Sequence, residues 1–521
     1  MSKEVHARSI TGAASVVGGA TALSRVLGYV RDAAIAYVFG AGVYSDAFFM
    51  AFRISNLLRR LLGEGALTSS FVPIFTEELG RRDGGEIKRL LSSIFTLFFI
   101  ILVVLAAAGI IFSSEIVRFL SPGFAQDPFK FNLTVRLTQF MFPYMVFVGL
   151  MAIAMGALNS VRHFAAPAVS PVFFNLAIIA AIFLVAPFLD SPVYALAIGV
   201  LAGGFFQFIM QVPYLKKFGL MPRPSFFFND AAIKQIFLLM GPAAFGLGVY
   251  QINSFVSLWF SSHLPEGSVS YLYFSGRLME LPIGVFGVAV ATAALPSLSG
   301  HAAKKDWDGL RSSLSFALRI VNFVTIPATV GLFILSYPII ITLFMRGEFG
   351  DAAVAGTAVA LYYYAIGLVP VSSARILTSV FYSIKDTTTP VWVAVVSLFV
   401  NVFFCFILVG PLKHGGLALA NSISAVVNAA LLLIILRKRF GMFGGKDILT
   451  SAIKSLAASV VMGVVMYPAI LYTGIDAKHK WMNFIVVPIA VAVGLCVYIF
   501  ASRIFKSKET AFLKDFLGKR G

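Results

Sequence analysis

Charged residues, cysteine and histidine are all scarce in this sequence of 521 residues. Charged side chains make up 12% of the chain, hydrophobic ones make up 59%, and the mean hydropathy is +0.90. A soluble domain has to face water with its own exterior, so this composition excludes an ordinary soluble protein. Lipid can act as a second solvent for such a chain, and the composition therefore predicts a polytopic membrane protein.

Metal centres and enzyme active sites have few residues to draw on. Cys405 and Cys496 both lie inside apolar runs, so we expect neither a disulfide nor a metal site. The six histidines are scattered one to a region, and no glycine-rich phosphate loop occurs. The loops are too short for the acid–base clusters of membrane enzymes. We therefore expect a transporter without a cofactor, and no enzyme activity.

Apolar segments of about 20 residues mark helices that span a membrane, and the sequence contains fourteen. Their approximate ranges are 9–39, 44–75, 90–113, 133–159, 165–187, 193–215, 232–261, 267–298, 312–344, 353–384, 389–410, 415–436, 448–472 and 481–503.

The distribution of basic residues predicts the orientation of these segments. With both termini inside, the cytoplasmic loops hold roughly 25 Lys and Arg and the outer loops about 6, as the positive-inside rule requires. This bias accounts for most of the net charge of +18. No basic segment lies in a soluble domain, so nucleic-acid binding is not expected.

The sequence also contains a weak internal duplication. ALNSVRHFAAP, ending at Pro167, matches VFYSIKDTTTP, ending at Pro390, at a shift of about 223 residues. Three more short matches occur near the same shift: Pro73 with Pro296, Ala195 with Ala418, and Gly219 with Gly441.

Because the shift spans six helices, both copies enter the membrane in the same direction. The predicted fold is all-α, with two six-helix lobes related by a pseudo-twofold axis along the membrane normal, plus two C-terminal helices. The predicted parts are residues 1–220, 221–442 and 443–521, the last including a basic cytoplasmic tail. Two facing lobes favour a central cavity and transport by alternating access.

Several charged residues lie where a membrane helix should be apolar, above all in FRISNLLRRLLGEG (52–65). A charge at a helix centre costs roughly 2.5–3.5 kcal/mol. Arg59 lies on the order of 20 Å from either surface, too deep for its side chain to reach water. On a helical wheel, a polar stripe within about 40° of one line contains Asp46, Arg53, Arg60 and Glu64, whereas Arg59 points about 100° away.

Segments 9–39 and 267–298 carry further charges. Arg25 and Asp32 share a helix face, Arg31 points elsewhere, and Arg277 can pair with Glu280 three residues later. Ion pairs that only fix helix packing would explain part of this set. Across the three segments, however, arginine exceeds acid, and guanidinium matches phosphate in a bidentate fork. We therefore expect an anionic, phosphate-bearing substrate.

Four stretches carry a family resemblance: SRVLGYVRDAAIAYVFGAG, DAFFMAF, NLLRRLLGEGALTSSFVPIF and RLMELPIGVFGVAVATAALPSLS. They resemble the MurJ (MviN) family of bacterial lipid II flippases, and the resemblance runs along essentially the whole chain. It implies the fold of the multidrug/oligosaccharidyl-lipid/polysaccharide exporter superfamily. It also implies a substrate, lipid II (undecaprenyl-diphosphate-linked disaccharide-pentapeptide), moved from the inner to the outer leaflet of the bacterial cytoplasmic membrane for peptidoglycan synthesis.

The resemblance also implies which residues bind substrate. It favours Arg59 over Arg60, although the wheel favours Arg60, and both stay candidates. The predicted substrate-binding residues are Arg25, Arg31, Asp32, Asp46, Arg53, Arg59, Arg60 and Arg277.

Two departures from the family pattern affect these expectations. Gly276 stands where many relatives have Asp before the arginine of segment 267–298. Some relatives bind sodium through carboxylates, but segments 232–261, 389–410 and 415–436 have no Asp or Glu in their interiors. The possible ion-binding residues there are Asn253, Asn401 and Asn421. The coupling ion stays open.

Other functions are compatible with the same residues. A flippase for another polyprenyl-diphosphate-linked oligosaccharide would use the same arginines. A multidrug exporter fits less well, because cationic drugs require a cavity lined by carboxylates. The expected partners are lipid II and the membrane lipids, in the inner membrane.

Overall fold

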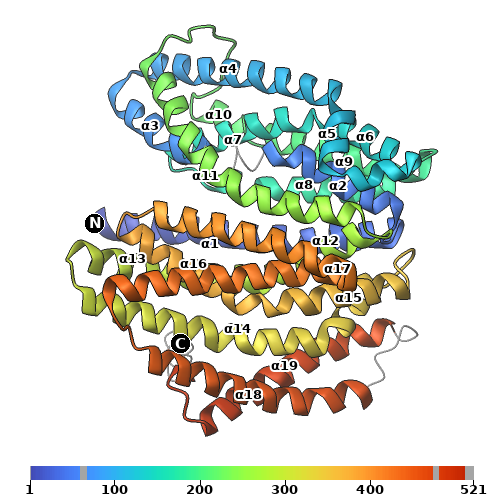
Figure 1. Cartoon of the computed structure of the whole chain (residues 1–521). Coiled ribbons are helices and arrows are strands. Elements are labelled where there is room, and N and C mark those ends of the chain that lie inside the picture. Colours follow the sequence, from blue (N-terminus) through green and yellow to red (C-terminus); the bar gives the residue numbers. More distant parts are fainter. Residues whose placement is uncertain (1, 59–66, 473–479, 511–521) are drawn as a thin grey trace. The chain divides into compact units, whose positions relative to one another are not determined.

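The computed structural model describes residues 2–58, 67–472 and 480–510, and every regular element in these ranges is helical. The chain forms two compact units, Met1–Glu266 (unit 1) and Gly267–Gly521 (unit 2) (Figure 1). The division falls after α11 (Ala231–Ser262), which packs with the N-terminal helices. The sequence predicts a division near residue 220 instead, and the three-part organisation stays a prediction.

Unit 1 is a bundle of helices in which α8 and α9 form a closely packed hairpin. Its α-helices are α1 (Ser2–Phe39), α2 (Val43–Leu58), α3 (Leu67–Arg81), α4 (Gly84–Ile111), α5 (Ser113–Leu120), α6 (Pro128–Met141), α7 (Tyr144–Ser160), α8 (Ala165–Leu184), α9 (Tyr194–Ile209), α10 (Val212–Lys217) and α11.

Small residues allow the helices of unit 1 to pack closely. α1 packs along α8, α7 packs against α9, and α2 packs against α6. A Cβ atom on Gly203 of α9 would come within 2.6 Å of the Phe174 ring on α8. Glycine at this position therefore lets the two backbones approach, as is common between membrane helices.

An ion pair joins the end of α3 to the start of α11. Arg82 donates from its two Nη atoms to the carboxylate of Asp230, at 2.6 and 2.9 Å, and also pairs with Glu78. Asp230 in turn accepts from the backbone N–H of Ala232 and so caps α11. The hydrogen bonds from Arg82 are the main reason that the pKa of Asp230 lies below its usual value.

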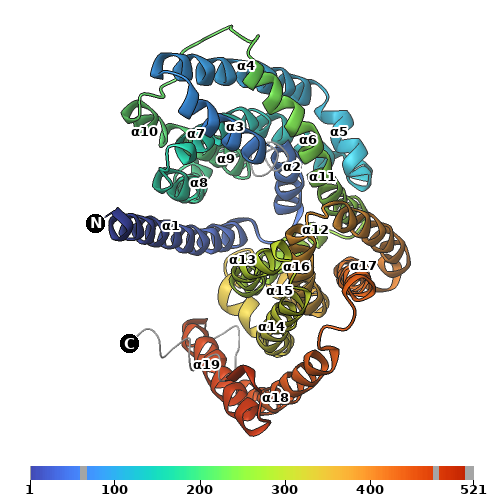
Figure 2. The same cartoon turned by 90° about the vertical axis from the view of Figure 1, so that its left-hand side faces the viewer.

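Unit 2 contains the remaining helices, and α14 lies at its centre (Figures 1 and 2). Its helices are α12 (Ser268–Pro282), the π-helix η4 (Ile283–Gly287), α13 (Val288–Ala303), α14 (Trp307–Phe344), α15 (Asp351–Ile366), α16 (Leu368–Ser383), α17 (Thr388–Phe440), α18 (Gly445–Tyr472) and α19 (Lys480–Ile504).

The 53 residues of α17 form two limbs rather than one straight rod. The backbone leaves the helical region at Lys413, with φ 50° and ψ −130°. Arg439 at the end of α17 lies 2.5 Å from Asp386, just before its start. A straight helix of this length would separate its ends by roughly 80 Å. The limbs correspond to the predicted segments 389–410 and 415–436.

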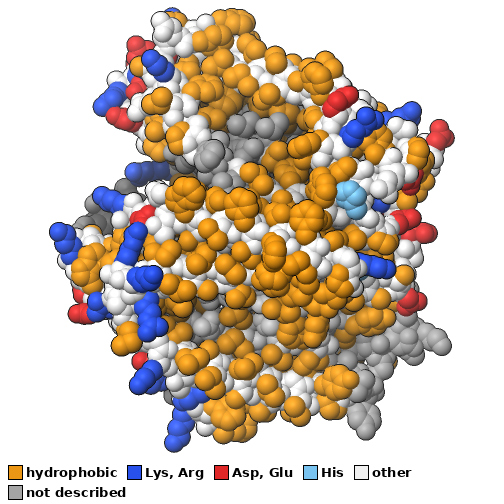
Figure 3. All heavy atoms as spheres, viewed as in Figure 1, with side chains coloured by type: hydrophobic (Ala, Val, Ile, Leu, Met, Phe, Trp, Pro, Cys, Tyr) orange, Lys and Arg blue, Asp and Glu red, His pale blue; other side chains and the backbone are white. Residues whose placement is uncertain are grey.

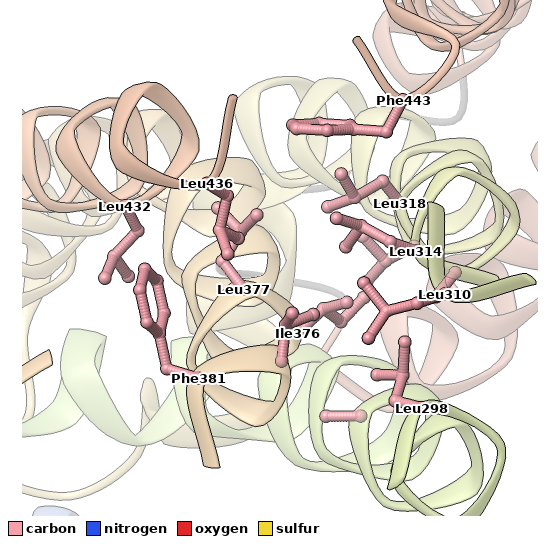
Figure 4. Close-up of a cluster of buried hydrophobic side chains, with 14 of the residues drawn as sticks. Leu298, Leu310, Leu314, Leu318, Ile376, Leu377, Phe381, Leu432, Leu436 and Phe443 are labelled. Carbon is pink, nitrogen blue, oxygen red and sulfur yellow. The ribbon is translucent and has the colours of Figure 1, made fainter. Parts of the chain in front are cut away.

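Two apolar clusters hold unit 2 together. Figure 4 shows the first, in which Leu310, Leu314 and Leu318 of α14 meet Ile376 and Leu377 of α16. Phe443, which follows α17, covers the same face of α14. The second cluster joins α14 to α18 and α19, with its core at Phe323, Ala458, Met462 and Tyr498.

Local geometry repeats at the shift seen in the sequence. Arg162 and Lys385 lie 223 positions apart, and both adopt left-handed backbone, with φ of 61° and 62°. In each case the backbone N–H of the following residue donates to the carbonyl oxygen five residues earlier. His163 donates to Leu158, and Asp386 donates to Phe381. Both helices thus end in the same C-terminal cap. Helix breaks repeat too, since α6 and α7 correspond to α15 and α16.

Among the described residues, nine helices are long and apolar enough to cross a membrane, or ten if the bent pair α15 and α16 is one span. The pair bends by 43°. Hydrophobic side chains cover much of the face shown in Figure 3. Basic residues lie at helix ends, as at Arg81, Lys217, Arg439 and Arg503. This pattern fits helices that begin and end at a charged membrane surface.

Candidate functional site

The first group of predicted site residues lies on α1, where it contacts α8. Arg31 donates to Oδ1 of Asp32 from Nη2 at 2.6 Å and from Nε at 3.0 Å. Its Nη1 atom also donates to Oδ1 of Asn175 on α8, at 3.1 Å. Arg31 is 8% exposed and Asp32 is fully buried. The structure therefore pairs Asp32 with Arg31, whereas the helical wheel places Asp32 on the same face as Arg25 and Arg31 on another.

Arg25 has a different environment from Arg31, although only six residues separate them. Its side chain is exposed, in a stretch of α1 where Leu23, Val26 and Val30 are exposed as well. Within the described part of the chain, no carboxylate forms an ion pair with Arg25. Its guanidinium therefore remains available to an anion from outside unit 1.

Asp46 begins the second group, on α2. Its Oδ2 atom accepts from Nζ of Lys130 at 2.8 Å, and both side chains are more than nine-tenths buried. Lys130, in the first turn of α6, also lies over the ring of Phe124 at 4.2 Å. Lys130 is not among the predicted site residues, because it lies near a helix start, outside the predicted span 133–159.

Arg53 lies seven residues after Asp46, on the same face of α2, and has a different kind of partner. Its Nη1 atom donates to Oγ of Ser254 on α11, at 3.3 Å. The guanidinium is half-buried and is bonded to a hydroxyl group there. Arg59, Arg60 and Glu64 lie outside the described residues.

Arg277, the predicted site residue of unit 2, lies on α12. Its Nη1 atom donates to Oε2 of Glu280 at 2.6 Å, so the predicted pairing over three residues is confirmed. Arg277 is 30% exposed and Glu280 is 59% exposed, so water screens the pair. Directly after α12, the π-helix Ile283–Gly287 interrupts the regular backbone. Such π-bulges are frequent at functional sites.

The charges of these groups only partly support the predicted excess of arginine. Asp32 is paired with Arg31, Glu280 with Arg277, and Asp46 with a lysine that the prediction did not include. Arg31 and Arg277 are thus held by carboxylates. Arg53 bonds a hydroxyl group, and Arg25 forms no ion pair with any residue in the described ranges. These pairings therefore reduce the excess of arginine that the sequence predicts.

Comparison with known proteins identifies the family. A family model described as lipid II flippase MurJ matches residues 35–492. This chain belongs to the MurJ family. The lipid II flippase MurJ of Burkholderia cenocepacia is 39% identical over 427 residues, which cover 81% of this chain and 83% of that relative. The probable lipid II flippase MurJ of Vibrio cholerae is 34% identical over 476 residues, 90% of each chain.

Solved structures agree with membership of the MurJ family. A lipid II flippase MurJ in an inward closed conformation is 28% identical, with a TM-score of 0.78, and the match covers 94% of this chain and 98% of that one. An inward-facing multidrug resistance transporter of the MATE family is 16% identical, with a TM-score of 0.69. The match covers 81% of this chain and 96% of that one. The second likeness shows the fold alone. The family consists of transporters and not enzymes, as the sequence predicts.

The asparagines predicted as ion ligands in this MurJ-family chain fall in different units. Asn253 lies on α11 of unit 1, whereas Asn401 and Asn421 lie on the two limbs of α17. Asn401 is fully buried, and its Oδ1 atom accepts from Sγ of Cys405 at 3.5 Å. Among the described residues, Nδ2 of Asn401 and Oδ1 of Asn253 have no hydrogen-bond partner. An ion-binding role for these residues stays a prediction.

Proposed function

We propose that this protein translocates lipid II from the inner to the outer leaflet of the bacterial cytoplasmic membrane. Two relatives that align over at least four-fifths of the chain are named lipid II flippase MurJ and probable lipid II flippase MurJ. The chain also supplies guanidinium groups that suit a diphosphate. The observation that carries the proposal is Arg25, an exposed guanidinium on an otherwise apolar stretch of α1, with no carboxylate among its described neighbours.

The diphosphate ligands in this proposal are the arginines predicted from the sequence. Arg25, Arg31, Arg53 and Arg277 bind the diphosphate, together with Arg59 or Arg60. Asp32 holds the Arg31 guanidinium, since it accepts from two of its nitrogens. Asp46 fixes the start of α2 through Lys130. The disaccharide-pentapeptide occupies the cavity and the polyprenyl tail stays in lipid.

Alternating access of two six-helix lobes moves the head group. The proposed arrangement has fourteen spans, with lobes 1–220 and 221–442, the pair 443–521, and both termini in the cytoplasm. The repeated caps at Arg162 and Lys385 support a duplicated lobe. The π-helix that follows Arg277 and Glu280 supports a hinge there. A coupling cation, if one is used, would bind near Asn253, Asn401 or Asn421.

Depletion of the protein in its host tests the proposal directly. The measurement is the access of externally added enzyme to the lipid II head group, followed in spheroplasts after depletion. We expect export to stop, and to resume when the wild-type chain is expressed. Normal export of lipid II without any substitute flippase would contradict the proposal. A simultaneous block in export of another polyprenyl-diphosphate-linked oligosaccharide would then identify that substrate class.

A further inference from the structure

A cavity of about 390 Å³ lies in unit 2, apart from the residues assigned to the substrate. It forms where the start of α14, the connection from α17 to α18 and the segment after α19 meet. Its size falls in the range of small-molecule sites. The apolar cluster of Figure 4 fixes one wall, because Phe443 packs against Leu314 and Leu318 of α14.

Three of the α14 residues that line the cavity are spaced four residues apart along the helix. Arg311, Ser315 and Arg319 therefore share one face of the helix. Ser315 is 8% exposed, and no residue in the described ranges forms a hydrogen bond with its Oγ atom. The Nε atoms of both arginines are also buried, and they lack an acceptor among the described residues. One face of α14 thus brings two guanidinium groups and a hydroxyl group to a single cavity.

The carboxylates near the cavity leave these donors incompletely satisfied. Glu509 approaches Nη1 of Arg319 only to 3.5 Å, longer than a good charge-assisted hydrogen bond. Asp308 pairs with Arg311 at 2.9 Å, but its side chain is 92% exposed and lies at the rim. Asp447 is also exposed, and it lies 3.8 Å from Lys508. The cavity lining itself therefore carries three basic residues, Arg311, Arg319 and Lys508, against two carboxylates at exposed positions.

The start of α18 adds backbone donors to the same place. Gly444 has a left-handed φ of 71°, and a Cβ atom there would come within 3.0 Å of Oγ of Ser315. Glycine thus allows the first turn of the 28-residue helix α18 to approach the arginine face of α14. The first N–H groups of a helix lack partners within it and favour anions.

We propose that this cavity binds a phosphate group, held by Arg311, Arg319, Lys508 and the start of α18. The inference is independent of the transport function proposed above. The group can come from an anionic phospholipid at the membrane surface or from a soluble phosphate compound. Met442 at the cavity is 76% exposed, and Leu449 and Ile453 on α18 are exposed as well. These apolar side chains are suited to contact the acyl chains of a lipid.

Binding by the purified full-length chain in neutral detergent tests this site. The probes are dioleoylphosphatidylglycerol, dioleoylphosphatidylcholine as the lipid control, and inorganic phosphate against chloride at equal ionic strength. Apparent dissociation constants come from the shift in melting temperature with ligand concentration. We expect Arg319→Gln to weaken phosphatidylglycerol binding about tenfold or more, because it removes charge-assisted hydrogen bonds. Lys508→Gln, at an exposed position, weakens it less and does not threaten folding.

Arg437→Gln is the matched control, since Arg437 is an exposed arginine at the same end of unit 2 and does not line the cavity. It should bind like the wild type. Phosphatidylglycerol binding that depends on Arg319 and Lys508 identifies a lipid head group. A response to inorganic phosphate alone, with the same dependence, identifies a soluble ligand and supports the site. Equal affinity in all variants, or no binding of either probe, would overturn the proposal.

Discussion

Lys130 and Asp46 form a buried ion pair across 84 positions of the sequence, with Nζ 2.8 Å from Oδ2. Removing only one partner would leave an uncompensated charge inside unit 1, which costs about 3–5 kcal/mol. We therefore expect Lys130→Met to lower the apparent melting temperature of the detergent-solubilised protein by several degrees. Lys234→Met on α11, which changes the same charge at an exposed position, should have little effect.

The double variant Lys130→Met/Asp46→Asn separates the pair from its surroundings. It removes both the ammonium group of Lys130 and the carboxylate charge of Asp46. No unpaired buried charge then remains, so the double variant should recover part of the stability lost in Lys130→Met. A double variant that is less stable than Lys130→Met by the full effect of Asp46→Asn would show that the two side chains act independently.

The ion pair between Asp230 and Arg82 predicts a pH dependence. The pKa of Asp230 is lower in the folded protein than its ordinary value of about 3.9, chiefly because Arg82 donates to it. The unfolded chain therefore takes up the proton first, so the contribution is complete above about pH 4 and is lost as the pH falls through the folded pKa. Asp230→Asn keeps the helix cap but loses the charge, at a cost of about 1–3 kcal/mol.

Melting temperatures of the wild type and of Asp230→Asn, measured from pH 7 to pH 3, test this expectation. The difference between them should be constant down to about pH 4 and should shrink below it. Asp190→Asn is the control, because Asp190 is a carboxylate of unit 1 that forms no ion pair with the residues described. A difference that grows as the pH falls would contradict the assignment.

The left-handed caps at Arg162 and Lys385 predict equal responses at two distant positions. This backbone already costs a residue other than glycine roughly 1–2 kcal/mol, and a β-branched side chain makes it worse. Arg162→Val and Lys385→Val should each destabilise the protein by about 1 kcal/mol more than Lys438→Val, which lies in the regular last turn of α17. Thermal unfolding of the three variants checks this ranking. A loss at only one of the two caps would argue against equivalent repeats.

Local sequence patterns predicted several features of this structure correctly. The apolar runs located the helices, and the spacing of Arg277 and Glu280 predicted their ion pair, since residues three apart on a helix are neighbours. The duplication aligned the two segments in which the structure shows matching caps, at Arg162 and Lys385. In each case, the interaction depends on residues that are close in sequence or on a repeat that the sequence itself displays.

The features that the sequence did not predict depend on contacts between residues far apart in the chain. The partner of Asp46 comes from α6, and no local pattern connects it to α2. Arg31 turns toward Asp32 because Asn175 on α8 holds its other nitrogen, a contact that a helical wheel does not contain. α11 packs with unit 1 although the predicted division assigns it to the second lobe. The wheel therefore predicted the faces of helices better than the partners of their side chains.

The contrast between Arg25 and Arg277 leads to a prediction about transport. Arg25 has no carboxylate partner among the residues described, so Arg25→Ala removes a charge that only an incoming anion would use. We expect Arg25→Ala to abolish growth in a strain depleted of the wild-type protein, with unchanged amounts in the membrane and an unchanged melting temperature. Arg25→Lys should restore growth only in part, because lysine keeps the charge but not the bidentate fork.

Arg277→Ala should also abolish growth, but Glu280→Gln should not, since the proposed ligand of Arg277 is the diphosphate rather than Glu280. Full growth of Arg25→Ala, or equal failure of Arg277→Ala and Glu280→Gln, would remove the reason for assigning these arginines to the substrate.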